Sequence, residues 1–308
     1  MLPLIREITI KKRVLNQLQS ALNICFSPLY LPREVDKHIP LHRGKNCINT
    51  LYISGVVLQR SKFTNMSPQV LATAIASHFS EKSQGEFTIH VVKPGWIHVT
   101  VNPTMLAAWL QTVASGGLLN GELEDLGDKG DKEDLGATEE LPMPNAQCPM
   151  PNAPCPMPHS PFPIQYAHAR CCSLLRLAHR EGLITLEPEP DNSLLPERII
   201  APNPLPWLDS DGQLSLVHPA ENRLIDKLVQ VIDDLYCGSP QQRVNWEKAA
   251  LDLSEAFGNF WADCRIWGEV KLNCENLAQA RLGLIMVTQS VLRLLLQDCL
   301  GVEAALEL

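Results

Sequence analysis

Residues 116–163 constrain the fold of this chain more than any other segment, because their composition cannot supply a hydrophobic core. Residues 122–140 are acidic, with 9 Asp and Glu against 2 Lys. A proline-rich heptapeptide then occurs three times, as PMPNAQC (142–148), PMPNAPC (149–155) and PMPHSPF (156–162). Proline fixes φ and lacks a backbone donor, which excludes a helix or an interior strand here. We predict a disordered, extended linker between two domains, residues 1–115 and 164–308; a ligand for a proline-binding groove is the alternative.

The two predicted domains differ in charge, although the net charge of the chain is only −8. Residues 1–121 hold 12 Lys and Arg against 5 Asp and Glu, whereas residues 141–308 hold 12 against 20. A basic excess suits contacts to phosphates, whose affinity falls steeply with salt, while ordinary solvated lysines are the alternative explanation. The acidic balance disfavours tight RNA binding by the C-terminal domain alone. The N-terminal domain is therefore the expected source of any salt-dependent affinity.

No apolar run in the sequence reaches the length of a membrane span. The best candidate, Leu282–Leu296, is interrupted by Gln289 and Arg293. The N-terminal stretch Met1–Arg13 carries five charged side chains where a secretory signal needs an apolar core. We therefore expect no membrane association and a cytoplasmic location.

Neither the cysteines nor the histidines have the spacing of a metal site. None of the ten cysteines forms a CxxC pair, and the adjacent Cys171 and Cys172 cannot chelate one ion as a spaced pair does. The nine histidines form no HExxH pattern, and no glycine-rich loop joins a strand to a helix. The carboxylates crowd into the linker, where no catalytic pair is preorganised. We expect no metal, no cofactor and no catalytic residue, with most cysteines reduced and buried.

Helix and strand signals alternate in the N-terminal domain. The predicted elements are a helix at Ile8–Cys25, a helix at Gln69–Phe79, strands at Phe87–Val92 and Trp96–Val101, and a helix at Pro103–Thr112. Ser67 and Pro68 mark the start of the second helix, as a cap followed by proline in the first turn. The intervening Lys93-Pro94-Gly95 predicts a β-hairpin. A small α+β domain with an antiparallel sheet is expected.

The C-terminal domain shows helical spacing of apolar residues and no strand pattern. Helices are predicted at about 164–181, 217–236, 240–264 and 276–300. The stretch 185–216, rich in proline and acidic residues, is expected to be an irregular excursion on their surface. The chain is therefore assigned to the α+β class, with an all-α helical bundle as its C-terminal domain.

Four strings of the C-terminal domain occur in the order of a known family. They are IQYAHARCCSLLR (164–176), ENRLIDKL (221–228), LSEAFGNFWADC (253–264) and ARLGLIMVT (280–288). The first resembles the start of the DALR anticodon-binding domain of arginyl-tRNA synthetases, where Q-Y-A-H-A-R-x-x-S-x-L-R is typical, and the third resembles L-A-x-x-F-N-x-F-Y-x-x-C. The resemblance covers roughly 140 residues and implies a helical anticodon-binding fold.

The N-terminal domain resembles the amino-terminal tRNA-binding domain of the same enzymes. The family string P-G-[FY]-[IL]-N corresponds to PGWIH at 94–98, and SPQVLATAIA at 67–76 fits the preceding helix. In these enzymes a Rossmann-type catalytic core, which needs on the order of 150 residues, lies between the two domains. In this chain the linker stands between the two domains in place of that core, and no HIGH or KMSKS string occurs. We expect that this chain does not charge tRNA by itself.

The resemblance assigns candidate contacts for the tRNA elbow to the hairpin. Trp96 stands for the family aromatic that approaches the D-loop, and an indole face can stack an unpaired base. His98 replaces the usual Asn, and because an imidazole donates and accepts hydrogen bonds in a different geometry from an amide, its selectivity for a base differs from that of Asn. Lys93 is a neighbouring cation that can contact phosphate. The alternative is that Trp96 packs in the sheet and His98 is an ordinary surface residue.

The resemblance also assigns candidate anticodon contacts in the C-terminal domain. Tyr166 and the cluster of Phe257, Phe260 and Trp261 correspond to the region that receives unstacked bases, with Trp261 in place of the usual Tyr. Arg170 is a candidate partner for phosphate or carboxylate. Aromatic residues spaced by three and four on an amphipathic helix also pack in cores, which is the alternative for Phe257 and Phe260.

These observations favour a non-catalytic tRNA-binding relative of arginyl-tRNA synthetase. The expected ligand is arginine tRNA, held by its elbow and anticodon arm and presented to another enzyme, either a tRNA-processing protein or a synthetase. A protein-interaction module that has lost RNA binding is the first alternative. A set of accessory domains that act in trans in aminoacylation is the second.

Overall fold

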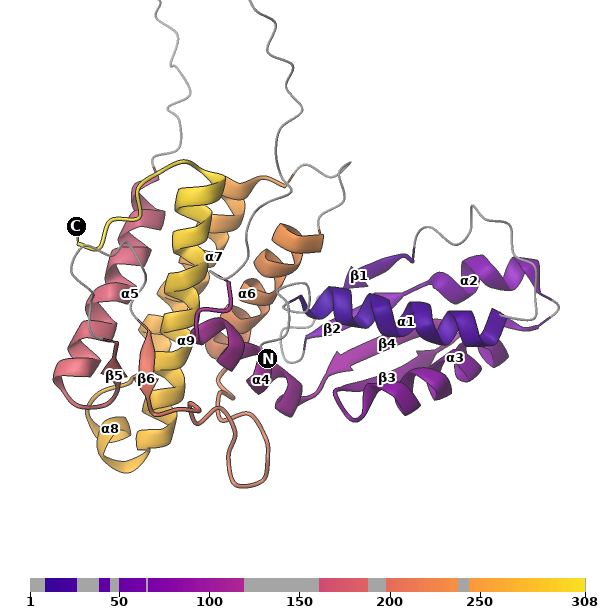
Figure 1. Ribbon diagram of the computed structural model, residues 1–308, viewed down its shortest axis with the longest axis horizontal. Coiled ribbons are helices and arrows are strands. Elements are labelled where there is room, and N and C mark those ends of the chain that lie inside the picture. Colours follow the sequence, from indigo (N-terminus) through magenta and orange to yellow (C-terminus); the bar gives the residue numbers. More distant parts are fainter. Residues whose placement is uncertain are drawn as a thin grey trace, which may run out of the picture.

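The computed structural model describes residues 9–26, 39–44, 50–64, 66–118, 161–187, 198–237 and 244–307 (Figure 1). Most of the predicted linker, residues 119–160, lies outside these ranges. The disorder predicted for it therefore stays a prediction. The described parts form an N-terminal sheet with helices and a C-terminal helical bundle, which confirms the predicted fold class.

The N-terminal part is built on a four-stranded antiparallel sheet in the order β1-β2-β4-β3. Its elements are α1 (Ile10–Phe26), β1 (Leu41–Arg43), β2 (Leu51–Ser54), α2 (Val56–Arg60), the 3-10 helix η2 (Ser61–Phe63), α3 (Pro68–Ser83), β3 (Phe87–Val92) and β4 (Trp96–Val101). The predicted hairpin of β3 and β4 is confirmed, with Val92 paired to Trp96. Ser67 caps α3 as expected, since its hydroxyl accepts from the amide of Val70 at 3.4 Å.

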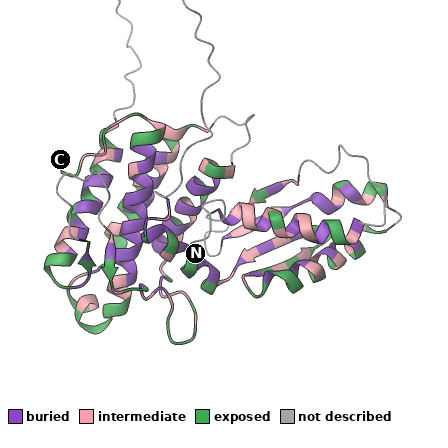
Figure 2. Cartoon of the chain, viewed as in Figure 1, coloured by how far each residue is buried: buried purple, intermediate pink, exposed green. Residues whose placement is uncertain are grey.

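The two faces of this sheet differ because side chains alternate along each strand. Ile97 and Val99 of β4 are fully buried on the face covered by helices, where α1 packs on α3 and α3 packs on β3. Trp96 and His98 of the same strand point to the opposite face, on which His90 is exposed. Figure 2 shows the resulting alternation of buried and accessible positions along the strands.

The C-terminal part is a helical bundle around one long apolar helix. Its elements are α5 (Phe162–Arg180), β5 (Thr185–Leu186), β6 (Ile199–Ala201), α6 (Pro219–Cys237), α7 (Trp246–Asp263), α8 (Glu269–Asn273), α9 (Glu275–Leu294) and the π-helical η3 (Leu295–Cys299). Helix α9 packs against α5, α6 and α7. The stretch 185–216 contains the two-stranded sheet of β5 and β6, which the sequence analysis did not anticipate because strands of two and three residues show no periodicity.

The helical segment Glu275–Cys299 is long and apolar enough to cross a membrane by length and composition alone. However, 72% of its apolar window is buried inside the fold. Side chains on all sides of α9 are buried, including Leu282, Ile285 and Gln289. A helix that is apolar all round is expected at the centre of a bundle, and α9 takes that place.

Helix α4 (Pro103–Ala114) packs on α9 and so joins the bundle, although the sequence analysis grouped it with the sheet. Its Leu110 and Val113 are fully buried. The side-chain oxygen Oε1 of Gln111 accepts from the indole N–H of Trp207 at 2.9 Å and from the backbone amide of Leu205 at 3.0 Å. Sequence proximity to β4 suggested the sheet as its partner, but the apolar surface of α9 covers it instead.

A polar junction also fixes the sheet to α6. Asp233 accepts from the Tyr52 hydroxyl at 2.6 Å and from the Lys11 amide at 3.1 Å, while the Arg43 guanidinium binds the side chain and the carbonyl oxygen of Asp226. Burial raises the pKa of Asp233 to about 6, against the lowering effect of the Tyr52 hydrogen bond. The two parts of the chain therefore meet directly through α4 and α6 (Figure 1).

Candidate nucleic-acid interface

A pocket of about 500 Å³ lies between α5 and α7. Its lining residues are Pro163, Tyr166, Ala167, Arg170, Leu251, Asp252, Ser254, Glu255, Phe257, Gly258 and Trp261. Three of the four predicted anticodon contacts, Tyr166, Arg170 and Trp261, are therefore brought together on one surface. We call this the α5–α7 pocket.

Aromatic rings and one guanidinium dominate the accessible wall of the α5–α7 pocket. Tyr166 is 55% exposed and stacks on Phe162, with ring centroids 6.3 Å apart and planes inclined by 26°. The Arg170 guanidinium lies over the Trp261 ring, 5.1 Å from its centroid. A cation held on an indole face presents its remaining N–H groups to solvent. The pocket thus offers both a flat stacking surface and a positive charge.

The fourth predicted anticodon contact does not reach this surface. Phe260 is fully buried, so its ring cannot stack a base in this structure. Its neighbour Phe257, whose ring centroid is 6.5 Å away, lines the pocket but is only 3% exposed, so both rings pack in the core. Phe257 and Trp261 are four residues apart and share a face of α7, whereas Phe260 points into the core. The register of α7 relative to α5 decides this, and sequence spacing alone does not reveal it.

Two carboxylates give the α5–α7 pocket an acidic edge. Asp252 forms an ion pair with Lys227 at 3.0 Å, and Glu255 is exposed. Ionised carboxylates accept hydrogen bonds only, so they can meet amino groups of a base or cationic side chains of a protein. Gly258 faces open space, since a Cβ added there meets no atom within 4 Å. The rim is therefore open beside the aromatic wall.

The other polar residues of the QYAHAR string hold the C-terminal segment. The Gln165 side chain donates to the carbonyl of Glu303 at 3.0 Å. His168 is fully buried, and its Nδ1 donates to the carbonyl of Ala305 at 2.9 Å while its Nε2 accepts from Gln289 at 3.1 Å. Burial lowers the pKa of His168, which favours the neutral ring that this pattern requires. Gln165 and His168 are thus structural, although their string also supplies Tyr166 and Arg170.

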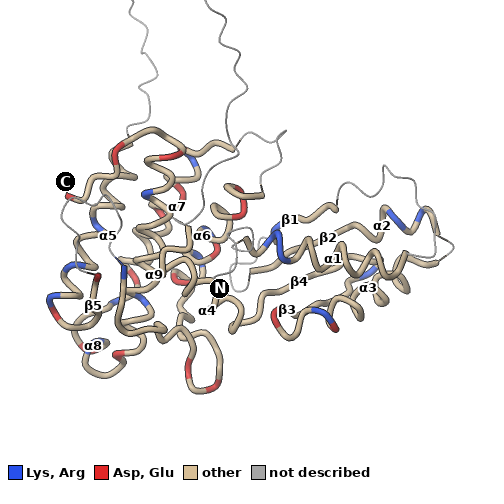
Figure 3. Tube along the Cα trace, in the orientation of Figure 1, with Lys and Arg blue, Asp and Glu red and all other residues tan. Residues whose placement is uncertain are grey.

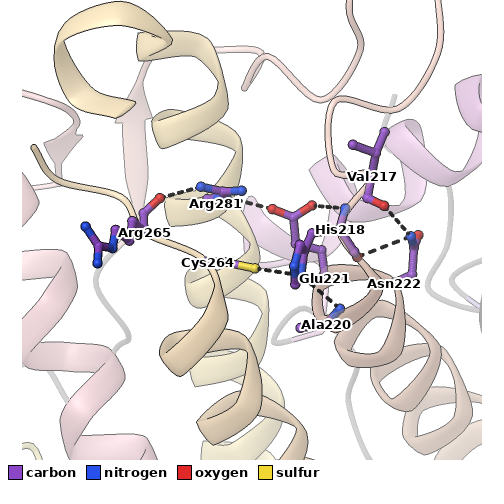
Figure 4. A network of polar contacts seen from close by, with 8 residues as sticks. All are labelled: Val217, His218, Ala220, Glu221, Asn222, Cys264, Arg265 and Arg281. Atoms are coloured by element: carbon purple, nitrogen blue, oxygen red, sulfur yellow. Dashed lines mark hydrogen bonds and ion pairs between the residues drawn. The ribbon is translucent and has the colours of Figure 1, made fainter. Parts of the chain in front are cut away.

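The strings at 221–228 and 280–288 meet in a buried ion pair (Figure 4). The Arg281 Nε donates to one oxygen of Glu221 at 2.6 Å, and the other oxygen accepts from the His218 amide at 2.8 Å. A guanidinium N–H of Arg281 also donates to the carbonyl of Arg265. Cys264 lies beside this pair, and burial raises the pKa of its thiol to about 12. These residues stabilise the bundle and provide no reactive thiolate.

The three predicted elbow contacts lie together at one end of the hairpin. Trp96 is 37% exposed, and its ring lies close to Gly55, where an added Cβ would be 2.8 Å from Cζ3. His98 is half-buried on the same face and lies between Ile53 of β2 and His90 of β3. Lys93 is exposed in the turn. The structure therefore brings Trp96 and His98 to one accessible face of the sheet, with Lys93 exposed in the adjoining turn.

Among the described residues, few carboxylates belong to the part of the chain around this hairpin. Residues 50–80 and 87–118 contain no Asp or Glu, and the acidic residues of the described N-terminal part are Glu81 and Glu86. Glu86 binds Arg13 at 3.2 Å. Among the described residues, no group of three or more His, Cys, Asp or Glu is placed to hold a metal ion. The sheet face can therefore approach phosphates without repulsion.

Comparison with known proteins supports the family resemblance for the C-terminal part. Residues 164–308 match the DALR anticodon binding domain. The arginine–tRNA ligase of Gloeobacter violaceus is 33% identical over 145 residues, which cover 46% of this chain and 21% of that protein. The arginine–tRNA ligase of Heliobacterium modesticaldum is 32% identical over 142 residues, 46% of this chain and 22% of that protein.

A third relative, the arginine–tRNA ligase of Pelodictyon phaeoclathratiforme, is 34% identical over 131 residues, 42% of this chain and 20% of that protein. This chain thus spans about a fifth of the length of the curated relatives it matches. No solved structure matches it. Residues 164–308 thus match the DALR anticodon binding domain and are similar to the corresponding part of arginine–tRNA ligases, and the sequence contains no HIGH or KMSKS string.

Proposed function

We propose that this chain is a non-catalytic tRNA-binding protein that holds an anticodon loop in the α5–α7 pocket. The observation that carries the proposal is the position of Tyr166, Arg170 and Trp261 around one open pocket of a DALR domain. Exposed aromatic rings stack unpaired bases, and a guanidinium binds phosphate or stacks in turn. The arrangement fits a single-stranded loop whose bases are unstacked.

The elbow of the same tRNA is proposed to bind the open sheet face at Trp96, His98 and Lys93. Trp96 and His98 share an accessible face, Lys93 is exposed in the adjoining turn, and the described residues 50–64, 66–80 and 87–118 include no carboxylate. Arginine tRNA is the proposed ligand, because the relatives that match the DALR domain are arginine–tRNA ligases by name. Because the sequence lacks the two catalytic strings, the chain is proposed to present this tRNA in the cytoplasm to another enzyme, and not to charge it alone.

One observation favours a second candidate function, a protein-interaction module. Residues 141–308 carry 20 Asp and Glu against 12 Lys and Arg, and Glu255 and Asp252 stand at the α5–α7 pocket. Carboxylates beside aromatic rings suit a basic peptide as well as a base. In that case the pocket takes a cationic side chain, and RNA does not compete for it.

A mobility-shift titration with arginine tRNA separates the two functions. Tyr166→Ala removes an exposed ring and is expected to weaken tRNA binding by about 5- to 100-fold, the range for loss of one stacked base. Leu272→Ala is the matched control, since Leu272 is 81% exposed on α8 and lies outside the pocket. Equal affinities of wild type, Tyr166→Ala and Leu272→Ala contradict the anticodon assignment.

Pyrophosphate exchange with arginine and ATP tests the non-catalytic part of the proposal. The purified chain is expected to give no exchange above background, because its sequence contains no nucleotide-binding loop. Pyrophosphate exchange that depends on arginine would contradict the proposal that the chain is non-catalytic. Exchange by an added arginyl-tRNA synthetase that rises when this chain is present supports action in trans.

A further inference from the structure

Exposed apolar side chains lie on the segments around the hairpin turn, namely at the end of η2, before and in the first turn of α3, and at the facing ends of β3 and β4. Of the exposed large hydrophobic residues in the described part of the chain, five belong to this set, defined here as the tip cluster: Phe63, Met66, Val70, Val92 and Trp96. Phe63 is 51% exposed at the end of η2, and Val70 is 55% exposed in the first turn of α3. Several exposed large apolar side chains at one end of a folded domain make that end a candidate interaction site.

Backbone contacts join the hairpin turn to the start of α3, and the Trp96 ring to the residue before α2. A Cβ added at Gly95 in the hairpin turn would lie 3.0 Å from Cβ of Pro68, the first residue of α3. The Trp96 ring lies against Gly55, the residue before α2. From there α2 and η2 rise by about 13 Å to Phe63. Trp96 and Phe63 are therefore two separate ring surfaces at the same end of the sheet.

The charge around the tip cluster is positive. Lys62 of η2 and Lys93 of the turn are exposed, and residues 50–80 and 87–118 contain no acidic residue. Figure 3 shows basic positions on α2 and just beyond it, at the end of the sheet away from the bundle; the one on α2, Arg60, is buried, so the accessible charge comes from Lys62 and Lys93. Aromatic surfaces interleaved with lysines are complementary to single-stranded nucleic acid, because bases stack and phosphates pair with cations.

We infer that the tip cluster extends the elbow site beyond the hairpin, which rests on the proposed tRNA function. Phe63 stacks a second unpaired base of the loop whose first base lies on Trp96. Lys62 contacts a phosphate of the connecting backbone, and the aliphatic side chains of Met66 and Val70 exclude water beside the ring. The ligand is a single-stranded RNA loop with at least two unstacked bases.

Equilibrium titration of the intact chain with tRNA tests this inference. Phe63→Ala is expected to lower the affinity by about 5- to 100-fold, as for loss of one stacked base. Because Phe63 is half exposed, the variant should unfold at the same temperature as wild type. Lys62→Gln is expected to reduce the slope of log K against log salt by roughly 0.7 to 0.9, which a merely structural residue does not change.

The outcomes distinguish this inference from the proposed function. If Trp96→Ala weakens tRNA binding while Phe63→Ala and Lys62→Gln bind as wild type does, the extension is wrong and the elbow site at Trp96 stands. If wild type shows no salt-sensitive tRNA binding, both are overturned. Leu272→Ala, exposed on α8 outside the cluster, serves as the control and should bind as wild type does.

Discussion

Two glycines within helices of the bundle differ in the space available for an added methyl group. Gly258 of α7 faces open space, whereas a Cβ at Gly283 of α9 would lie 2.6 Å from the Trp207 ring and 2.8 Å from Leu205. Gly283 therefore permits the close approach that lets Trp207 reach Gln111 of α4. Neither role follows from the sequence, where both glycines interrupt helical patterns in the same way.

Alanine at these two positions is expected to change stability in opposite directions. Gly258→Ala should raise the free energy of unfolding by about 0.5–1 kcal/mol, because alanine loses less backbone entropy in a helix. Gly283→Ala should lower it by about 1–3 kcal/mol, because the methyl group overpacks the contact with Trp207. Urea denaturation of both variants measures the two changes, and equal signs contradict the packing described for α9.

The buried ion pair of Glu221 and Arg281 should contribute more to the free energy of unfolding than the exposed ion pairs do. Glu221→Ala leaves the Arg281 guanidinium without its carboxylate and is expected to lower the free energy of unfolding by about 3–5 kcal/mol. Lys271→Ala breaks a pair with Glu181 that is partly exposed, and about 0–1 kcal/mol is expected. Thermal unfolding of both variants provides the comparison, and similar losses contradict the structural role of the buried pair.

At the level of elements, periodicity in the sequence predicted the long helices and the hairpin. Helix α3 begins at Pro68 as its cap predicted, and α1 at Ile10–Phe26 lies within two residues of its expected bounds. Strands β1 and β2 were missed, because three and four residues are too short to show alternation. A long amphipathic pattern is enough to predict a helix from its own residues. A short strand forms because it pairs with residues distant in the sequence, so its own residues do not predict it.

The partners of the helices were less predictable than the helices themselves. Helix α4 was grouped with the sheet and packs on α9, and Phe260 was expected in the site that Phe257 lines. In both cases the apolar face was recognised, but the neighbour that covers it depends on tertiary packing. Tyr166, Arg170 and Trp261 were found because the family strings place them, and the tip residue Phe63 belongs to no such string.

In the whole molecule, the sheet and the bundle meet at carboxylates of α6 that burial makes hard to ionise. Burial raises the pKa of Asp233 to about 6 and also raises those of Asp226 and Asp234. Lys11, Arg43 and Tyr52 of the N-terminal part face these groups. Since the raised pKa belongs to the folded state, the stabilising contribution of Asp233 is complete in acid and is lost as the pH rises through about 6.

Asp233→Asn should remove this pH dependence while keeping the shape of the side chain. Between pH 4 and 7 the free energy of unfolding of wild type is expected to fall relative to that of Asp233→Asn by on the order of 2–3 kcal/mol. The difference between the two proteins cancels the titration of all other groups. Denaturation curves at several pH values measure it. A difference that stays constant over this range shows that Asp233 does not titrate at the junction.

The direct junction also bears on how the two candidate RNA surfaces cooperate. Helix α4 packs within the bundle, and the sheet binds α6, so the surfaces at Trp96 and Tyr166 are connected through packed elements. Surfaces held in this way gain effective concentration without depending on the linker at 116–163. The basic N-terminal part supplies the charge, and the acidic bundle supplies the aromatic pocket.

Filter binding of arginine tRNA to the intact chain, at about 50 and 200 mM salt, tests tRNA recognition most directly. Recognition of tRNA by both surfaces predicts binding at micromolar protein or below in low salt. It also predicts a loss of at least about tenfold at the higher salt, and weaker binding by Trp96→Ala and Tyr166→Ala. Absence of salt-sensitive binding at micromolar protein, with both variants indistinguishable from wild type, would contradict it.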